Sequence, residues 1–371
     1  MMSNKLNLVL IFGGKSGEHD VSLMSARSVL NALDREKYQV FELGITNEGR
    51  WLCGENALEA FESGNTARLR QALLFTKEDK PYLFNLLDEK LTEVTPIDIV
   101  FPVLHGTFGE DGTIQGLFEI HNCAYVGAGV LASSLAMDKG LCKDVVRQAG
   151  IPVLPYGIYS RKEIELHLPR IIEVVESFLK YPVFVKPANL GSSVGISKAK
   201  NRTALRTALQ LAARYDRRVL VEQGIEAREI EISVLGNEKP LCSQPGEIIP
   251  GDEFYTYTDK YRSGDPEIAI PAPLSEEQSR QLRLWAFEAF RAVDGAGLAR
   301  VDFLLDKNSG KAWFSELNTM PGFTQISMFS KLLAYEGIDY PSLVDRLIQL
   351  GLERKAEQDR TIRKFEVENG N

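Results

Sequence analysis

In the first third of the chain, continuous runs of hydrophobic residues alternate with segments whose hydrophobic residues have helical spacing. The runs at residues 6–12, 38–45 and 97–104 have strand length and little polar interruption, which is typical of strands buried on both faces of a parallel sheet. Between the first two runs, apolar residues recur at the spacing of one helical face over residues 23–33. Strands that alternate with helices predict a doubly wound, parallel α/β domain, which we expect to span residues 1–138.

The pattern changes to shorter elements in the middle of the chain. A helical pattern covers residues 131–150 and ends at Gly150-Ile151-Pro152, a common helix stop. Short strand-like runs then alternate with two helical stretches, which predicts an α+β domain over residues 139–224. The strands are expected at 156–159, 182–186, 195–198 and 219–222, and the helices at 163–179 and 204–215.

The last third combines a long aperiodic stretch with a helix and a hairpin. Residues 243–266 show no clear periodicity but carry several aromatic residues, and loops of this length in compact domains are often functional lids. A helix follows at 275–295, and two strand-like runs at 298–305 and 311–318 are joined by a turn-forming Asp-Lys-Asn-Ser-Gly cluster. We expect residues 225–371 to form a third domain with a charged tail.

The predicted hairpin gathers four polar side chains on one face. If its turn is centred near Ser309, Asp302 lies opposite Glu316 and Arg300 lies opposite Asn318. Two carboxylates about 5 Å apart repel each other, and a hard divalent cation such as Mg²⁺ or Mn²⁺ would relieve that repulsion. The alternative is an exposed face on which Arg300 pairs with the two acids. The register depends on the turn, so both interpretations stay open at this point.

Composition and charge narrow the class of protein. The 371 residues are too many for one compact core, and 44% hydrophobic with 25% charged residues is typical of a globular protein. The net charge of −8 argues against nucleic acid or an anionic membrane as a partner, and no apolar run reaches the about 20 residues of a membrane span. The four cysteines form no ligand cluster, which predicts free thiols in a reducing cytoplasm and no zinc.

Two glycine-rich loops follow predicted strands of the first domain. Gly13-Gly14-Lys15-Ser16-Gly17 leads to Glu18, and residues 105–112 begin with His105 and contain three glycines. Ligands of α/β proteins bind beyond the carboxyl ends of the strands, so Glu18 and His105 are candidate site residues. The alternative for His105 is a structural capping role.

A third loop, at residues 187–195, lies between two predicted strands of the middle domain. Lys186 closes the apolar strand before it, and the loop carries small hydroxyl residues bracketed by glycines. Such a loop can direct backbone N–H groups at phosphate oxygens, whereas the alternative is a flexible hairpin turn. Glu222 ends the next strand, where its backbone and carboxylate can meet an adenine or a ribose.

The chain carries eight short motifs in one order: GGKSGEHDVS, HGTFGEDGTIQG, MDK, VKPANLGSSVG, VEQGIEAREIE, FYTYTDKY, RVDF and ELNTMPG. This order resembles the D-alanine–D-alanine ligases of the ATP-grasp superfamily, and the resemblance covers nearly the whole chain, from residue 8 to residue 350. Gln223 stands where many members have lysine, and Asn189-Leu190 replaces a more polar pair. Both departures concern nucleotide contacts and not the chemistry.

The resemblance implies an ATP-grasp fold, with nucleotide between antiparallel sheets of the middle and last domains. It also implies a reaction in which ATP phosphorylates the carboxylate of one D-alanine and the amine of a second D-alanine attacks the acyl phosphate. The products are D-alanyl-D-alanine for peptidoglycan precursors, ADP and phosphate. The expected partners are ATP, two D-alanine molecules and two Mg²⁺ or Mn²⁺ ions, in a cytoplasmic homodimer. The alternatives are a D-alanine–D-lactate ligase, against which Tyr261 argues, and an ATP-grasp protein that binds nucleotide without turnover.

Individual roles follow from the same resemblance. The implied metal ligands are Asp302, Glu316 and Asn318. The residues implied for the nucleotide are Lys139, Lys186, Glu222, Gln223, Ile225, Glu229 and the lid residue Lys260. The residues implied for the two D-alanines and the reacting centre are Glu18, His105, Ser192, Tyr261, Arg300, Gly322, Ser327 and Met328. Among these, Glu18 holds the first ammonium group, Arg300 and the Gly322 N–H stabilise the oxyanion, and Ser327 contacts the second carboxylate.

Overall fold

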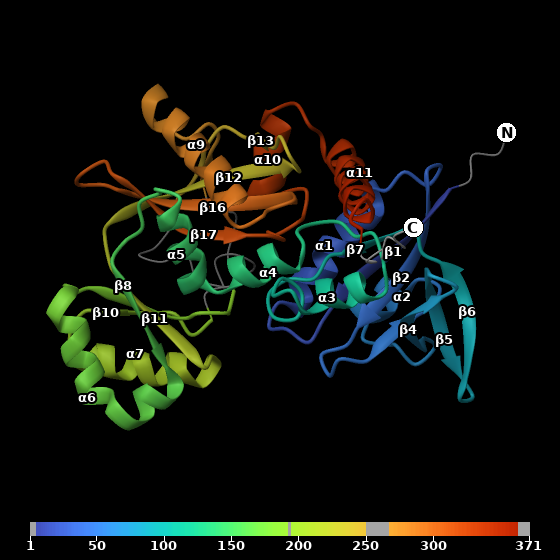
Figure 1. The fold of residues 1–371 in the computed structure, drawn as a ribbon, viewed down its shortest axis with the longest axis horizontal. Helices are drawn as coiled ribbons and strands as arrows, with labels where there is room; N and C mark the ends of the chain where they lie inside the picture. Colours follow the sequence, from blue (N-terminus) through green and yellow to red (C-terminus); the bar gives the residue numbers. More distant parts are fainter. Residues whose placement is uncertain (1–4, 192–193, 250–266, 363–371) are drawn as a thin grey trace, which may run out of the picture.

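The computed structural model describes residues 5–191, 194–249 and 267–362, and it contains three β-sheets with helices packed against them (Figure 1). Ser192, Lys260 and Tyr261 lie outside the described residues, as does most of the predicted lid. The described part of that lid is not all loop, because Gly246–Ile249 forms strand β14. Its backbone pairs with a neighbouring strand, a long-range contact that periodicity does not encode.

The first sheet has seven strands in the order β6-β5-β4-β3-β2-β1-β7. The strand β1 pairs in parallel with β2 and β7, which confirms the parallel α/β arrangement expected for this part of the chain. The other strands extend the sheet in antiparallel fashion, and this pairing was not predicted because its outermost strand is mostly exposed. The elements are β1 (Leu6–Gly13), α1 (His19–Ala32), β2 (Tyr38–Ile45), β3 (Trp51–Cys53), α2 (Ala57–Glu62), β4 (Arg70–Lys77), β5 (Lys80–Leu87), β6 (Lys90–Pro96), β7 (Ile99–Pro102) and α3 (Thr113–Ile120).

The prediction of a single helix at residues 131–150 is wrong, because the structure has two helices, α4 (Val130–Met137) and α5 (Lys139–Gln148). The break falls at Asp138, whose backbone is extended and whose carboxylate accepts hydrogen bonds from two N–H groups at the start of α5. Aspartate is a favoured N-cap, so the residue between the two helices ends one and begins the other.

The second sheet has four strands in the order β10-β9-β11-β8, all paired antiparallel. Its helices α6 and α7 lie together on one face, where their apolar residues and those of the strands form one hydrophobic cluster (Figure 1). The predicted α+β elements of this region are all present. Their bounds are β8 (Tyr156–Ser160), α6 (Arg161–Phe178), β9 (Val183–Pro187), β10 (Ser197–Ala199), α7 (Arg202–Tyr215) and β11 (Arg218–Gln223).

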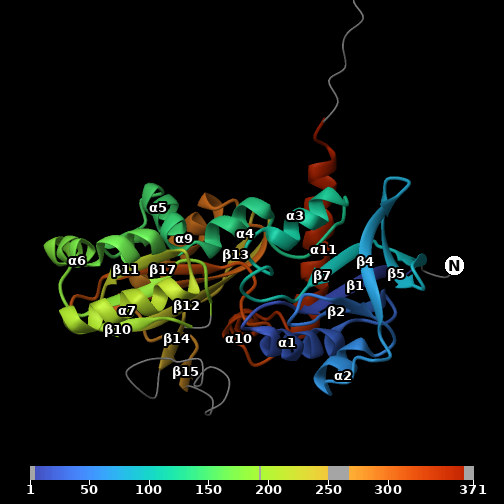
Figure 2. The same ribbon diagram turned by 90° about the horizontal axis from the view of Figure 1, so that it is seen from below.

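The third sheet follows the order β15-β14-β12-β16-β17, with β13 paired to β12. Helices α4, α5 and α9 share a hydrophobic cluster with this sheet (Figure 2). The predicted hairpin is present as β16 and β17. The elements are β12 (Ala227–Gly236), β13 (Leu241–Cys242), β14, β15 (Glu267–Ala269), α9 (Glu276–Ala292), β16 (Gly297–Asp306), β17 (Ala312–Asn318), α10 (Met328–Tyr335) and α11 (Tyr340–Asp359).

The last helix, α11, packs on the first sheet as well as on the third (Figure 1). Buried residues of β1, β7 and α11 belong to one hydrophobic cluster, which also contains Phe323 from the turn after β17. Tyr38 donates a hydrogen bond of 2.6 Å from its hydroxyl to Asp345 at the edge of this contact. The first and third sheets are therefore joined by a shared core, which fixes the turn after β17 against the first sheet. None of the helices in the described part of the chain combines the length and apolarity that a membrane crossing needs.

Candidate active site

The hairpin of β16 and β17 places its four polar residues as expected. Asp302 pairs with Glu316 and Arg300 with Asn318, which confirms the register at the site. Beyond Asp302 the register shifts, so that Phe303 lies opposite Phe314. This β-bulge was not predicted. The bulge leaves the site residues aligned and increases the local twist of the hairpin beyond them.

A third strand adds a carboxylate that the sequence analysis did not assign to the site. Glu231 of β12 lies directly opposite Asp302, so Glu231, Asp302 and Glu316 form a row across three adjoining strands. We call these three residues the acidic row. Glu229 and Glu231 are two residues apart and so share one face of β12, but the pairing of β12 with β16 has no local signal in the sequence.

Arg300 is paired with the acidic row in the structure. Its Nε and Nη2 donate hydrogen bonds of 2.8 and 2.7 Å to the two carboxylate oxygens of Asp302, and its Nε lies 3.1 Å from Glu231. Burial alone would lower the pKa of Arg300, but Asp302 and Glu231 raise that pKa well above its usual value. The side chains of Arg300 and Asp302 are only 17% and 14% exposed, so this is a buried arrangement and not the exposed face considered as the alternative.

The donor atoms of this face suit a hard divalent cation. Carboxylate oxygens of Asp302 and Glu316 and the amide of Asn318 lie on adjoining strands, and the Asn318 Nδ2 donates to Asp302 over 3.0 Å. Within the described residues, no group of three or more His, Cys, Asp or Glu side chains is arranged to hold a metal ion. Mg²⁺ is usually held by one or two carboxylates together with phosphate oxygens, and this chemistry fits the residues present.

A second charged group lies between α5 and the middle sheet and is rich in lysine. The Glu222 carboxylate lies 2.6 Å from the Lys143 Nζ and accepts a hydrogen bond of 2.9 Å from the Lys186 Nζ. The Lys143 and Glu222 side chains are 1% and 2% exposed. We call Lys143, Lys186 and Glu222 the buried trio. Burial opposes ionisation of Glu222, but the two lysines hold the pKa of its carboxyl below the usual value.

The buried trio changes two expectations about its members. The Glu222 carboxylate was expected to meet an adenine or a ribose, but it is enclosed between two lysines. Lys143 was not among the candidate site residues predicted from the sequence. Burial opposes protonation of Lys186, yet Glu222 raises the pKa of that lysine above its usual value.

Lys139 connects the two charged groups. Its Nζ donates a hydrogen bond of 2.8 Å to the Leu190 carbonyl in the loop after β9, and it lies 3.5 Å from the Glu316 carboxylate. The neighbouring Asp138 pairs with Arg218 over 2.8 Å and accepts a bond of 3.2 Å from Asn189 in the same loop. The break between α4 and α5 therefore puts a lysine between the acidic row and the loop predicted to bind phosphate.

The first domain holds the turn after β17 through two side chains. His105 Nδ1 lies 2.9 Å from the Met320 carbonyl, and Glu110 accepts a hydrogen bond of 2.8 Å from the Met320 N–H. The other ring nitrogen of His105 lies 3.0 Å from the Ser25 hydroxyl, so both ring nitrogens have partners within the protein. This is what the alternative of a structural role for His105 predicts. Desolvation lowers the pKa of His105, and burial together with Glu18 raises the pKa of Glu110 to about 8. Sequence reasoning missed Glu110.

Glu18 is the residue at which three loops meet. It precedes α1, and its carboxylate lies so close to two glycines that a Cβ on Gly106 would be 2.3 Å, and on Gly191 2.7 Å, from its Oε2. Gly106 also has a φ of +71°, which favours glycine. The predicted partner Ser192 follows Gly191 directly in sequence.

The residues expected to bind the second carboxylate lie at the start of α10. Ser327 is the N-cap, and its Oγ accepts a hydrogen bond of 3.0 Å from the Thr324 N–H. Met328 begins the helix and its side chain is buried against Ile248 and Leu332, so only its backbone N–H can serve a ligand. First-turn N–H groups have no intrahelical partner and attract anions.

The residues expected at the adenosine end lie where β11 leads into β12. The Gln223 amide folds back on the chain, accepting from the Lys180 N–H at 2.9 Å and donating to the Lys180 carbonyl at 2.8 Å. Ile225 is half-buried in the connection, and Glu229 is half-buried on β12. The side chain of Gln223 is therefore used within the protein, which leaves its predicted nucleotide contact to the backbone.

Comparisons with known proteins match this arrangement of elements. The family model described as D-ala D-ala ligase N-terminus matches residues 7–128, and the one described as D-ala D-ala ligase C-terminus matches residues 145–349. The chain is 49% identical to a D-alanine–D-alanine ligase of Heliobacterium modesticaldum, over 96% of this chain and 97% of that protein. It is 46% identical to one of Bacillus pumilus, over 95% and 98%.

Solved structures agree with the sequence matches. The structure of the D-alanine–D-alanine ligase from Coxiella burnetii has a TM-score of 0.82 and 35% identity and covers 96% of each chain. The VanG D-Ala:D-Ser ligase from Enterococcus faecalis has a TM-score of 0.82 and 32% identity, over 94% of this chain and all of that one. With both halves matched by family models and with relatives aligned end to end, this chain belongs to the D-alanine–D-alanine ligase family.

Proposed function

We propose that this chain joins two D-alanine molecules into D-alanyl-D-alanine with ATP, through a D-alanyl phosphate intermediate, for peptidoglycan precursor synthesis. The observation that carries the proposal is the position of Lys139, between the Glu316 carboxylate and the Leu190 carbonyl. Cation-binding and anion-binding groups meet there, as a Mg²⁺–phosphate complex requires. A protein that only bound nucleotide would have no need for the oxyanion donors described below.

The phosphate groups of ATP are the proposed ligands of Lys139 and Lys186. Lys143 keeps Glu222 paired, so that Lys186 stays protonated and held at the end of β9. Asp302, Glu316 and Asn318 would hold two Mg²⁺ or Mn²⁺ ions, which would neutralise developing negative charge when bound. These assignments explain why lysines and carboxylates lie side by side in one buried region.

The first D-alanine is proposed to bind where the three loops meet at Glu18. The Glu18 carboxylate pairs with its ammonium group, and the predicted hydrogen bonds with Ser192 and Tyr261 tie that carboxylate to the lid. Arg300 and the Gly322 N–H stabilise the oxyanion that forms when the acyl phosphate is attacked. His105 and Glu110 position this centre by holding both polar groups of the Met320 peptide.

The second D-alanine is proposed to bind at the start of α10. The Ser327 hydroxyl and the Met328 N–H hold its carboxylate, and the adjacent turn with Gly322 brings its amine to the acyl phosphate. At the other end of the site, the proposed adenosine contacts are the backbone of Glu222, Gln223 and Ile225 together with Glu229, and Lys260 remains a predicted ligand of the phosphates. The proposed domains, 1–138, 139–224 and 225–371, each contain one of the three sheets, which supports this division.

We also propose that the protein is a cytoplasmic homodimer. ATP is available in the cytoplasm, and all four cysteines are free thiols, as in a reducing compartment. The exposed apolar side chain of Leu131 (61%) on α4 supports burial against a second copy. Sedimentation equilibrium measures the mass directly, and a monomer at all concentrations contradicts the assembly.

The experiment that tests the function is a product assay with ATP, Mg²⁺, D-alanine, D-lactate and D-serine together. D-lactate stands for the main alternative, and D-serine is included because of the likeness to the VanG D-Ala:D-Ser ligase. We expect D-alanyl-D-alanine as the main product, with ADP release that depends on D-alanine. Mixed products dominated by D-lactate or D-serine contradict the proposed second substrate, and ADP release without D-alanine contradicts the ligase.

A substitution in the lid separates the dipeptide from the ester product. We expect Tyr261→Phe to raise the use of D-lactate relative to D-alanine, because the tyrosine hydroxyl belongs to the predicted network with Glu18 and Ser192. The measurement is the ratio of the two products at neutral pH, with Tyr335→Phe, an exposed tyrosine on α10, as the control. An unchanged product ratio in Tyr261→Phe would show that this hydroxyl does not select between D-alanine and D-lactate.

A further inference from the structure

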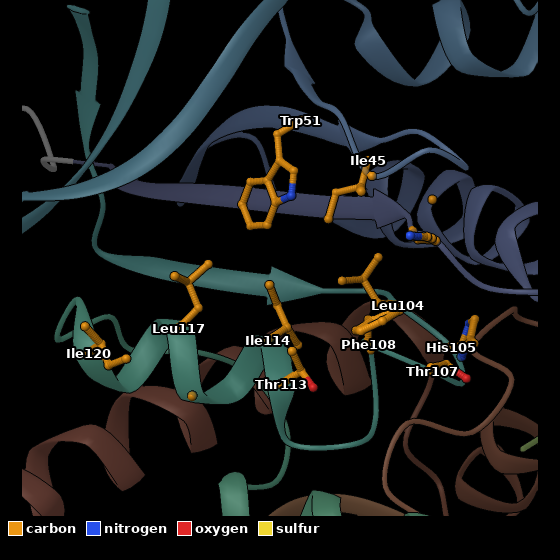
Figure 3. Close-up of a pocket in the computed structure, with 16 residues that line it drawn as sticks. Ile45, Trp51, Leu104, His105, Thr107, Phe108, Thr113, Ile114, Leu117 and Ile120 are labelled. Atoms are coloured by element: carbon orange, nitrogen blue, oxygen red, sulfur yellow. The ribbon is translucent and has the colours of Figure 1, made fainter. Parts of the chain in front are cut away.

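The first domain contains a cavity of about 540 Å³ that the proposed reaction does not use. It lies between the strands β1 to β3 on one side and α3 with its preceding loop on the other (Figure 3). In Figure 3, Trp51 and Ile45 approach from one side, and Ile114 and Leu117 of α3 approach from the other. The volume falls within the range of small-molecule sites. Its large apolar lining residues are Ile45, Trp51, Leu104, Phe108, Ile114, Leu117 and Ile120.

The cavity lies at the place where α/β sheets bind ligands. Alternate residues of β1 belong to two different hydrophobic clusters, one shared with α1 and the other with α3. The two helices therefore cover opposite faces of the sheet, and β1 and β7, which they follow, are neighbours. A crevice forms beyond the carboxyl ends of two such strands, and it is the usual ligand position in open α/β sheets.

The cavity is separate from the proposed active site. Its lining includes His105 but none of the residues assigned to metal, phosphate, adenosine or the second D-alanine. The two ring nitrogens of His105 face Met320 and Ser25, which do not line the cavity. The cavity thus shares loops with the active site without being part of it.

Gly116 gives an independent sign that the space is kept open. It lies in the middle of α3 and lines the cavity, and a Cβ built on it would meet no atom within 4 Å. Other lining glycines have a packing reason, such as Gly109, where a Cβ would lie 2.7 Å from Leu104. Glycine in a helix interior costs about 1 kcal/mol relative to alanine. No contact in the described structure explains that cost at Gly116, whereas an occupant of the cavity does.

Lys15 supplies the polar part of the lining. It follows Gly13 and Gly14 at the end of β1, it is exposed, and no residue in the described part of the chain forms an ion pair with it. The hydroxyl-bearing residues Thr107 and Thr113 also line the cavity. An apolar body would fill the space between Trp51 and Leu117, and an anionic group would lie near Lys15.

We propose that this cavity is a binding site for a small aromatic or branched apolar molecule that carries one anionic group. The apolar lining removes the body of the ligand from water, and the Lys15 ammonium pairs with its charge. Because the inference concerns binding alone, it stands or falls independently of the ligase reaction.

The probe for the test is 1-anilinonaphthalene-8-sulfonate, which has an aromatic body and one sulfonate. With the full chain we expect saturable binding and energy transfer from tryptophan to the probe, and most of that transfer is lost in Trp51→Phe, which keeps Trp285 and Trp313. Gly116→Leu fills the cavity and should weaken binding by more than about tenfold, whereas Gly116→Ala should change it by less than about twofold. Leucine favours helix over glycine, so both variants should unfold at or above the parent's temperature.

A second pair of variants tests the charge. Lys15→Met should weaken sulfonate binding by about two- to fivefold, as expected for one exposed ion pair, and Lys15→Arg should keep it. The uncharged N-phenylnaphthylamine should bind equally to all three proteins. Absence of saturable binding, undiminished transfer in Trp51→Phe, or a folded Gly116→Leu that binds like the parent overturns the site. Equal sulfonate binding by Lys15→Met overturns the anionic ligand.

Discussion

The acidic row and the buried trio are two charged groups of opposite sign in the same proposed active site. The acidic row has three carboxylates with Arg300 and Lys139 as its cations, so its formal charge is negative. The buried trio has two lysines and one carboxylate, so its formal charge is positive. Each group keeps an excess of the charge that its proposed ligand neutralises, metal ions for the first and phosphate for the second.

The two groups differ in how the protein holds them. The acidic row lies on paired strands, where the register fixes the spacing of the carboxylates. The buried trio joins α5, β9 and β11, and its spacing depends on how a helix packs on a sheet. Changes in the acidic row should therefore affect the reaction more than the fold, and changes at the centre of the buried trio should affect the fold as well.

Asp302→Asn is expected to have the largest effect. It removes a charge from the metal-binding face while keeping the shape, and we expect kcat to fall by about 10³- to 10⁴-fold at ordinary Mg²⁺ concentration. The thermal unfolding temperature should stay close to that of the parent. ADP release in the presence of D-alanine measures the effect, and Asp306→Asn at the exposed end of the same strand is the matched control. Near-normal turnover of Asp302→Asn would falsify the proposed metal face.

Lys143→Met is expected to have the next largest effect, and on stability. It leaves Glu222 with one cation in a buried position, and breaking a buried pair in this way costs about 3–5 kcal/mol. Denaturant titration of the free energy of unfolding checks this value. Lys37→Met, which breaks the exposed pair with Asp345, should cost less than about 1 kcal/mol. Equal costs for the two substitutions contradict the structural role of the buried trio.

Lys186→Met should weaken ATP use more than it weakens the fold. Glu222 keeps Lys143 as a partner in this variant, but a charged hydrogen bond to phosphate is lost, which is worth about 1.5–3 kcal/mol. We expect kcat/KM for ATP to fall by about ten- to hundredfold. Lys198→Met, on the neighbouring strand β10, serves as the control. A variant that loses stability but retains kcat/KM shows that Lys186 belongs to the fold alone.

Glu231→Gln should have the smallest effect of the four. Glu231 lies in the same row as Asp302 but is not a proposed metal ligand, and its contact is with Arg300 at 3.1 Å. Weaker restraint of Arg300 should lower kcat by about three- to tenfold, the size expected for one hydrogen bond. Steady-state assays across Mg²⁺ concentrations give the result. A loss as large as that of Asp302→Asn would mean that the metal face extends to the third strand.

The fold was predictable where one element carries its own pattern. The buried strands of the first domain, the helices of the middle domain and the hairpin of β16 and β17 follow from periodicity and turn residues. Errors arose where the pattern was interrupted by a single residue or by exposure. Asp138 divides a continuous helical pattern, and the mostly exposed β6 has no apolar run.

The candidate site divides in the same way. The opposition of Asp302 and Glu316 is local, because a short turn fixes which residues face each other. Glu231 joins them only through a strand that is distant in sequence, and Glu110 reaches Met320 only because α11 and the turn after β17 pack on the first sheet. Motif order pointed to the family, but it did not give these partners.

The sequence by itself determined the elements that carry their own pattern, the face of the hairpin, the family and the chemistry that its motifs imply. Tertiary structure alone decided that Lys143 would be buried beside Glu222, that both ring nitrogens of His105 would be used within the protein, and that a cavity would open beside Gly116. The reason is physical. Side-chain direction within one strand or helix repeats with a fixed period, whereas contacts between distant elements depend on how all of the packed surfaces fit together.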